Sequence, residues 1–207
     1  LQMDYIGELA RYHGKIWLRS FSNVSNTYWL NELDFDESNL STSFSTQYDT
    51  GLAQGPDLGA LSAINATTII CTYGSSLKKI DISSGAAIVT TLFDLSPAVT
   101  PPFIFVPRDT LYILSSNSYL VVGGGNQDPT SGQNYSGLYS DIIAHFDSSG
   151  NLIGTGVINT GPSVQEISYS AFCYNGEIYI TSLPNPIFSP NQGTTTFLVD
   201  LPTLTLS

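Results

Sequence analysis

Carboxylates are the side chains through which this sequence could most readily do chemistry. Their densest group lies in the segment LDFDES, which holds Asp34, Asp36 and Glu37. Acidic residues at this spacing resemble part of a calcium-binding loop, without the glycine and the distal glutamate of an EF-hand. The three are candidate calcium ligands, and a solvated turn is the alternative interpretation.

Other catalytic arrangements are absent from the sequence. The two histidines, His13 and His145, lack the spacing of a zinc site and have no evident nucleophile beside them. Cys71 and Cys173 have no basic neighbours in sequence, so nothing favours a reactive thiolate, and both are interpreted as small buried hydrophobic residues. The sequence therefore predicts no catalytic residue, no metal site beyond the calcium candidates and no cofactor.

A glycine run at Gly123–Gly125 follows an apolar stretch and could suggest a phosphate loop. A Walker loop needs Lys-Ser or Lys-Thr after the glycines, whereas Asn126-Gln127 follows here. The glycines are predicted to end a β-strand.

The polar segment NQDPTSGQNYSGLYS, from residue 126 to residue 140, is the candidate binding loop. Long loops in compact folds are often functional, and tyrosine beside amide side chains can stack on a sugar or pack against a protein. The candidate binding residues are Asn126, Gln127, Asn134, Tyr135 and Tyr139. A loop without function is the alternative.

Four Asn-x-Ser/Thr sequons are candidate N-glycosylation sites, at Asn23, Asn39, Asn65 and Asn134. They are compatible with an extracellular or cell-surface protein. Only 11 % of the 207 residues are charged, which leaves a surface built largely of neutral polar side chains.

The charge balance bears on the partners. The formal net charge is −11 with only six Lys and Arg residues, so a phosphate backbone or an anionic membrane would find no basic patch. No apolar run reaches the roughly 18 residues of a membrane-spanning helix. The expected partners are a protein or a glycan, including other copies of the chain, with no nucleic acid and no membrane insertion.

The elements that must position these residues are β-strands. Short β-branched and aromatic runs bounded by Gly, Asn, Asp and Pro recur, and helical periodicity is nearly absent. Four hairpin patterns with turns at Gly14, Asn65, Asn117 and Gly176 repeat with a period near fifty residues, which indicates propeller blades. The second strands begin at equivalent places, and these are Ile16, Ile69, Tyr119 and Ile178.

Later in each unit an apolar residue precedes an aspartate, as in KIDISSG at Asp81 and HFDSSGN at Asp147. Such a carboxylate accepts hydrogen bonds from amides just downstream and makes a turn between a third and a fourth strand. The prediction is one all-β domain over residues 1–207, a β-propeller of about four four-stranded antiparallel blades, alone or within a larger propeller. The units cover residues 8–50, 58–100, 105–160 and 165–207.

The third unit, with SYLVVGGG followed by YSDIIAHFD, resembles a kelch repeat, in which four hydrophobic residues, a glycine pair, a tyrosine and an aspartate turn succeed one another. The other units share its skeleton but carry LRSF, CTYG and ITSL in place of the glycine pair. The resemblance implies kelch-like propeller blades.

Two further expectations follow from the repeat. Cys71 and Cys173 lie in units two and four and should not be bonded to each other. The alternating Leu1, Met3 and Tyr5 predict a strand that completes the last blade.

The expected function is an extracellular binding or structural module, not an enzyme, that contacts protein or glycan or belongs to a larger assembly. The alternatives are a glycan-active enzyme with carboxylates in the propeller funnel and a viral or phage fibre component.

Overall fold

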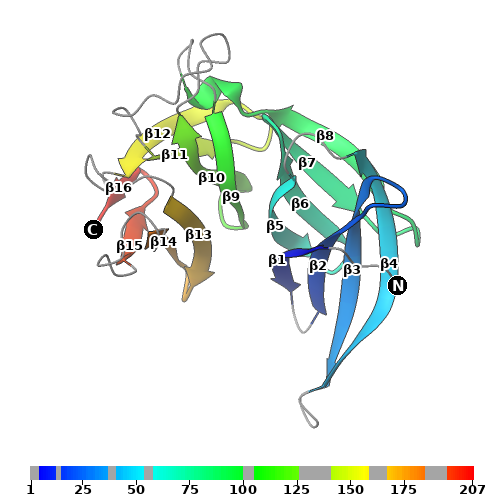
Figure 1. Ribbon diagram of the computed structural model, residues 1–207. Coiled ribbons are helices and arrows are strands. Elements are labelled where there is room, and N and C mark those ends of the chain that lie inside the picture. The colour runs from blue at the N-terminus through cyan, green and yellow to red at the C-terminus, as the bar shows by residue number, and fades with distance from the viewer. Residues whose placement is uncertain are drawn as a thin grey trace. The chain divides into compact units, whose positions relative to one another are not determined.

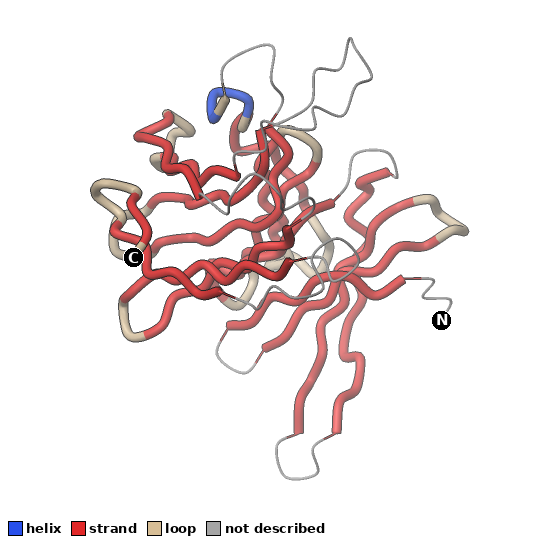
Figure 2. The backbone as a smooth tube through the Cα atoms, turned by 60° about the vertical axis from the view of Figure 1, so that its left-hand side comes forward, coloured by secondary structure: helices blue, strands red, loops and turns tan. Residues whose placement is uncertain are grey.

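The computed structural model describes residues 5–12, 15–36, 41–53, 58–99, 105–125, 141–158, 167–184 and 195–207. Nearly all of this backbone is strand, and the helical structure within it is one 3-10 turn, η1 (Ser96–Ala98) (Figure 2). None of the described segments is a helix with the length and hydropathy needed to span a membrane. The all-β prediction is confirmed.

The chain divides into two compact units, which are larger than the four repeats predicted from the sequence. From here on, unit 1 means residues 1–93 and unit 2 means residues 94–207. Unit 1 holds two four-stranded antiparallel sheets (Figure 1). The first sheet consists of β1 (Tyr5–Tyr12), β2 (Lys15–Ser22), β3 (Thr27–Asp36) and β4 (Ser41–Ala53). The second consists of β5 (Leu58–Asn65), β6 (Thr68–Tyr73), β7 (Ser76–Asp81) and β8 (Ile88–Asp94). In both sheets the strands pair in the order of the sequence.

Unit 2 repeats this design with two more sheets (Figure 1). The third sheet consists of β9 (Phe105–Ile113), β10 (Ser118–Gly125), β11 (Asp141–Phe146) and β12 (Leu152–Ile158). The fourth consists of β13 (Ile167–Tyr174), β14 (Glu177–Pro184), β15 (Thr195–Asp200) and the short β16 (Thr205–Leu206). The expected second-strand residues Ile16, Ile69, Tyr119 and Ile178 each take the second position of β2, β6, β10 and β14, which confirms that register.

Turn residues explain where the hairpins close. Asn117 and Gly176 have positive φ values of 48° and 83°, as a tight turn requires, whereas Asn65 closes its turn by accepting the Thr67 amide on its side chain. The aspartate turns form as expected. Asp81 Oδ1 accepts the Ser83 amide at 2.9 Å, and Asp147 Oδ1 accepts the amides of Ser149 and Asn151.

Each unit has a hydrophobic core between its two sheets. In unit 1, Trp17 and Leu30 of the first sheet lie in one cluster with Ile69 and Ile80 of the second. In unit 2, a second cluster joins the third sheet to the fourth, and it contains Leu120, Val122, Ile143, Ile178, Ile180 and Val199. Within each unit the first strands of successive sheets are neighbours, β1 beside β5 and β9 beside β13.

A side chain links the first strands of unit 2. Asp109, on β9, accepts the Ala171 amide of β13 on Oδ2 at 2.6 Å and the Thr110 amide on Oδ1. The carboxylate therefore satisfies a main-chain donor that no strand pairing would satisfy.

The glycine run ends a strand, as predicted, since β10 runs to Gly125. Gly123 has a packing reason: a Cβ there would come within 2.4 Å of the Val106 carbonyl oxygen and 2.8 Å of the Phe105 ring. Only glycine lets β10 approach β9 so closely at this point.

Two expectations need correction. Tyr5 and Ile6 pair with Phe21 and Ser20 of the first sheet, so they extend β1 and do not complete the last blade. Pairing with β2 gives the backbone groups of Tyr5 and Ile6 their hydrogen-bond partners within the first sheet. Both cysteines are free, as expected, but Cys173 is exposed, because it lies near the end of a hairpin and not in a sheet interior.

Candidate functional site

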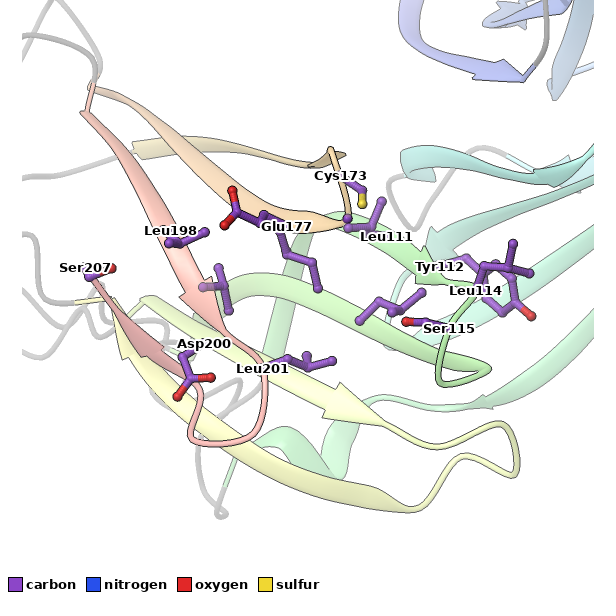
Figure 3. A pocket seen from close by; sticks show the side chains of 14 residues that line it. Leu111, Tyr112, Leu114, Ser115, Cys173, Glu177, Leu198, Asp200, Leu201 and Ser207 are labelled. Atoms are coloured by element: carbon purple, nitrogen blue, oxygen red, sulfur yellow. The ribbon is translucent and has the colours of Figure 1, made fainter.

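A pocket of about 750 Å³ lies in unit 2 (Figure 3). The end of β9 and the turn after it form one side, the β13–β14 turn forms another, and β15 with the turn that follows completes the wall. Ligand pockets usually enclose roughly 300 to 1,000 Å³, so this one can hold a small molecule.

The pocket wall is mainly aliphatic. Ile113, Ile178 and Val199 are at most 7 % exposed and belong to the core cluster of unit 2, so they form the floor. Leu114, in the turn after β9, is 78 % exposed and lies at the mouth. The other aliphatic lining residues are Leu111, Leu198 and Leu201.

Two acidic residues border the same pocket. Glu177 begins β14 and accepts a hydrogen bond from the Tyr179 hydroxyl on Oε2 at 2.6 Å. Asp200 ends β15 and accepts one from the Thr203 hydroxyl on Oδ2 at 2.6 Å. Both residues are exposed, and the lining residues include no Lys, Arg or His. Neighbouring residues of a strand point to opposite faces, so the Glu177 side chain lies with Tyr179 and not on the side of the buried Ile178. The pocket thus has an apolar floor and no basic lining residue.

An aromatic side chain and a thiol complete the wall. The Tyr112 hydroxyl donates to Asn117 Oδ1 at 2.8 Å, and its ring lies 5.4 Å from that of Tyr119, so the ring is held in place. Cys173 adds an exposed thiol.

A second group of polar side chains lies in unit 1. Glu32, 7 % exposed, forms an ion pair with Lys15 and accepts a hydrogen bond from the Tyr48 hydroxyl at 3.3 Å. The hydrogen bond with Glu32 raises the pKa of Lys15, and burial followed by the Glu32 charge raises the pKa of Tyr48. Because the carboxylate is paired on both sides, this group stabilises the first sheet and leaves little acceptor capacity for a ligand.

His145 is buried on β11, with Nε2 2.8 Å from the Ser118 hydroxyl, and burial lowers its pKa. The described ranges bring no three His, Cys, Asp or Glu residues together as a metal site would require. His145 is thus a packed residue of β11.

The calcium candidates do not form a turn in the described part. Asp34 and Asp36 belong to β3 and pair with Ser43 and Ser41 of β4, while Glu37 lies outside the described residues.

All five candidate binding-loop residues and two of the sequons also lie outside the described residues, namely Asn126, Gln127, Asn134, Tyr135, Tyr139 and Asn39. Asn23, in the turn before β3, and Asn65, at the end of β5, are both exposed.

The sequence pattern alone does not identify the residues of the pocket. Glu177 follows the Asn175-Gly176 turn, and Asp200 follows an apolar residue as Asp81 and Asp147 do in their repeats. Period-two alternation could have placed Ile178 and Val199 on an inner face, but it does not say that the acidic residues beside them border a cavity.

No family model matches the chain, and no curated protein sequence matches it. Solved structures do. The GH32 β-fructofuranosidase of Bombyx mori aligns with 99 % of this chain at 11 % identity and a TM-score of 0.55, and the chain spans 48 % of that enzyme. A variant of that enzyme in complex with sucrose gives a TM-score of 0.57.

Two more neighbours are enzymes. A bifunctional GH43-CE protein of Bacteroides eggerthii has a TM-score of 0.59 at 10 % identity, over 96 % of this chain and 24 % of that one. The periplasmic gluconolactonase of Pseudomonas aeruginosa has a TM-score of 0.51 at 10 % identity, over 96 % of this chain and 69 % of that one.

These likenesses, together with the four four-stranded antiparallel sheets, establish the fold. They bring no evidence for kelch repeats, so the kelch resemblance stays a prediction. The expectation that the chain is not an enzyme is overturned, because these neighbours with the same architecture are glycoside hydrolases and a lactonase. The chain has the β-propeller fold.

Proposed function

We propose that the chain is the propeller, or a part of the propeller, of a glycan-active enzyme. The observation that carries this proposal is the likeness of at least 96 % of the chain to carbohydrate-processing enzymes at TM-scores of 0.51 to 0.59. Because the chain spans less than half of the GH32 and GH43 proteins, the activity belongs to the proposal and not to the fold.

Glycoside hydrolysis needs two carboxyl groups, one to protonate the leaving oxygen and one to activate water or attack the sugar. Glu177 and Asp200 border the pocket and lie on neighbouring strands, next to the Ile178–Val199 pair of β14 and β15. A hydroxyl holds one oxygen of each, through Tyr179 and Thr203, which orients the carboxylate and leaves its other oxygen to a substrate. They are the acid–base candidates of this proposal.

The test is an assay of the purified chain on sucrose, gluconolactone and a series of 4-nitrophenyl glycosides, with products separated by anion-exchange chromatography. We expect release of sugar from at least one substrate. Glu177→Gln and Asp200→Asn each remove a proton donor or a charge while keeping the shape, and a loss of about a hundredfold or more is expected if they act in the chemistry.

Asp49→Asn is the matched control, because Asp49 is exposed and lies in β4, outside the pocket. Turnover of none of the substrates would contradict the enzyme proposal. Turnover that survives both pocket substitutions would contradict the assignment of Glu177 and Asp200.

We further propose an extracellular or periplasmic setting, which agrees with the low charge content and with the exposed sequons at Asn23 and Asn65. Expression through a eukaryotic secretory pathway should give a chain whose mass falls on treatment with peptide N-glycosidase. Asn23→Gln and Asn65→Gln would then each remove one glycan. If treatment with the glycosidase left the mass of the wild type and of both variants unchanged, glycosylation at these sites would be contradicted.

A further inference from the structure

The two faces of the fourth sheet differ in character. Neighbouring residues of a strand point to opposite faces. Ile178, Ile180 and Val199 point toward the third sheet, because they belong to the core cluster that joins the two sheets. The residues that alternate with them therefore point away from that core, and they are polar or aromatic where the core residues are aliphatic.

These alternating residues make up what we call the outer face of the fourth sheet. The strand register arranges them in three rows across β13, β14 and β15. An acidic row holds Tyr174, Glu177 and Asp200, an aromatic row holds Phe172, Tyr179 and Leu198, and a hydroxyl row holds Ser170, Thr181 and Thr196. Because strands lie about 4.8 Å apart and alternate residues about 6.6 Å apart, the rows span about 10 by 13 Å.

The aromatic side chains of the outer face are open to solvent and have ordered neighbours. Tyr174 is 64 % exposed and Phe172 is 40 % exposed. The Phe172 and Tyr179 rings lie 5.5 Å apart and are 17° from parallel. The Tyr179 hydroxyl donates to Glu177 Oε2 at 2.6 Å, and this bond raises the pKa of Tyr179, so the hydroxyl keeps its proton. Rings and carboxylate are held in place before a ligand arrives, which lowers the entropic cost of binding.

Charge limits what can cover the outer face. Glu177 and Asp200 repel an anion, and none of the three rows holds a basic residue. A second copy of the chain would bring a further net charge of −11 against them. An apolar sheet would bury both carboxylates and the hydroxyl row without partners, and burying unpaired polar groups is costly.

An uncharged glycan suits all three rows at once. Its C–H faces can pack against aromatic rings, and its hydroxyls can donate to the carboxylates. At the other end of the face, the Thr181 and Thr196 hydroxyls lie 3.1 Å apart and can each donate or accept. A cation would be attracted by the acidic and aromatic rows but would leave the hydroxyl row unused.

We propose that the outer face of the fourth sheet binds an uncharged oligosaccharide, with Phe172, Tyr174 and Tyr179 packing against its sugar rings beside Glu177 and Asp200. The inference rests on the proposed function, in which these two carboxylates act on the substrate. It adds the substrate class and the surface that holds it, neither of which the fold supplies.

Isothermal titration calorimetry tests binding separately from turnover. The purified chain is titrated with four neutral glycans (cellohexaose, xylohexaose, mannohexaose and inulin), with hexagalacturonate as an anion and with spermine as a cation. At least one neutral glycan should bind, and hexagalacturonate should not.

Variants then locate the site. Tyr174→Ala and Phe172→Ala should each weaken glycan binding by about fivefold to tenfold, because each removes one ring contact, whereas Tyr174→Phe keeps the ring and should keep the affinity. Ile153→Ala is the matched control, since Ile153 is 58 % exposed on β12, outside the outer face, and should bind as the wild type does. Urea unfolding of each variant checks that it folds.

Failure of every neutral glycan to bind, or tighter binding of spermine than of any glycan, would overturn the inference. Binding that is unchanged in both Tyr174→Ala and Phe172→Ala would place the glycan elsewhere. Dimerisation of the wild type that Tyr174→Ala abolishes, measured by sedimentation equilibrium, would identify a second copy as the occupant. Hydrolysis that persists in any of these cases would leave the proposed function intact. Glycan binding as expected without turnover would refute the proposed function and leave the binding face standing.

Discussion

At the scale of single residues, the two cysteine thiols differ in reactivity because one is buried and the other is exposed. Cys71 is at the centre of the unit 1 core, where desolvation opposes the thiolate, and Cys173 is at an exposed hairpin end. His145 shows the same effect on a base, because burial opposes its imidazolium.

The first prediction concerns the thiols. At neutral pH, N-ethylmaleimide should add once to the folded chain and twice to the chain unfolded in urea, because Cys173 is exposed, whereas Cys71 is buried and burial raises its pKa to about 12. Intact-mass measurement counts the adducts, and Cys173→Ser should abolish labelling of the folded chain. Rapid double labelling without denaturant would show that Cys71 is accessible.

The second prediction concerns pH. The pKa of His145 is lowered in the folded chain from its usual 6.5, so the unfolded chain takes up the proton first as pH falls. The contribution of neutral His145 to stability is therefore complete above pH 6.5 and is lost progressively below it. His145→Gln cannot take up this proton, so its free energy of unfolding should depend less steeply on pH between about 7 and 5 than that of the wild type. Urea unfolding at both pH values measures the two slopes, and equal slopes would contradict the assignment.

At the scale of elements, the glycines of β12 set how closely the turn before β16 can lie. A Cβ on Gly156 would approach the Leu204 carbonyl oxygen to 2.1 Å, while one on Gly154 would meet only the end of the Leu204 side chain at 3.2 Å. The first contact is with backbone and cannot relax without moving the turn. The second can relax by a small side-chain rotation.

The third prediction uses this matched pair. Gly156→Ala should lower the free energy of unfolding by about 1 to 3 kcal/mol, the usual range for overpacking, and Gly154→Ala should have a smaller effect. Chemical denaturation of the two variants and the wild type compares them directly. A ranking in the opposite order would mean that the approach of Leu204 to β12 is not as described.

At the scale of the whole molecule, charge dominates behaviour in solution. The net charge of −11 arises from few ionisable groups, and the isoelectric point calculated from the sequence is about 4.1. Mutual repulsion between copies therefore weakens steadily as the solution is acidified toward that value.

The fourth prediction follows from this balance. Solubility should fall to a minimum near pH 4 and rise with pH up to neutrality, because molecules without net charge associate most readily. Light scattering across this range gives the measurement. A minimum near neutral pH would instead point to association through a specific surface.

The repeat and the strand order could be predicted because turn chemistry is local. Asn117, Gly176, Asp81 and Asp147 act through their own backbone or through residues a few positions away. The environment of Cys173 could not be predicted in this way, because an alternating strand assigns a face but not whether a neighbouring element covers it.

The pocket escaped prediction for a related reason. Glu177 and Asp200 lie on different strands, and the turn after β9 adds Leu114 from another sheet. Glu177 and Asp200 are neighbours within one sheet, beside the Ile178–Val199 pair, but the closeness of Leu114 to them depends on how two sheets pack, which no spacing within one repeat encodes. The sequence favours a binding module over the glycan-active alternative because it carries no nucleophile or metal motif, whereas the fold likeness does not depend on such motifs.

The position of each hydrophobic core between two sheets has a consequence for how the sequence can change over time. A bulky residue such as Trp17 fills space that Ile69 of the next sheet must leave free, so a tolerated substitution in one sheet calls for a complementary one in its neighbour. Across related sequences, correlated substitutions should therefore connect positions one repeat apart more often than positions within a single sheet. Paired substitutions of this kind keep the packing between neighbouring sheets while the individual residues change.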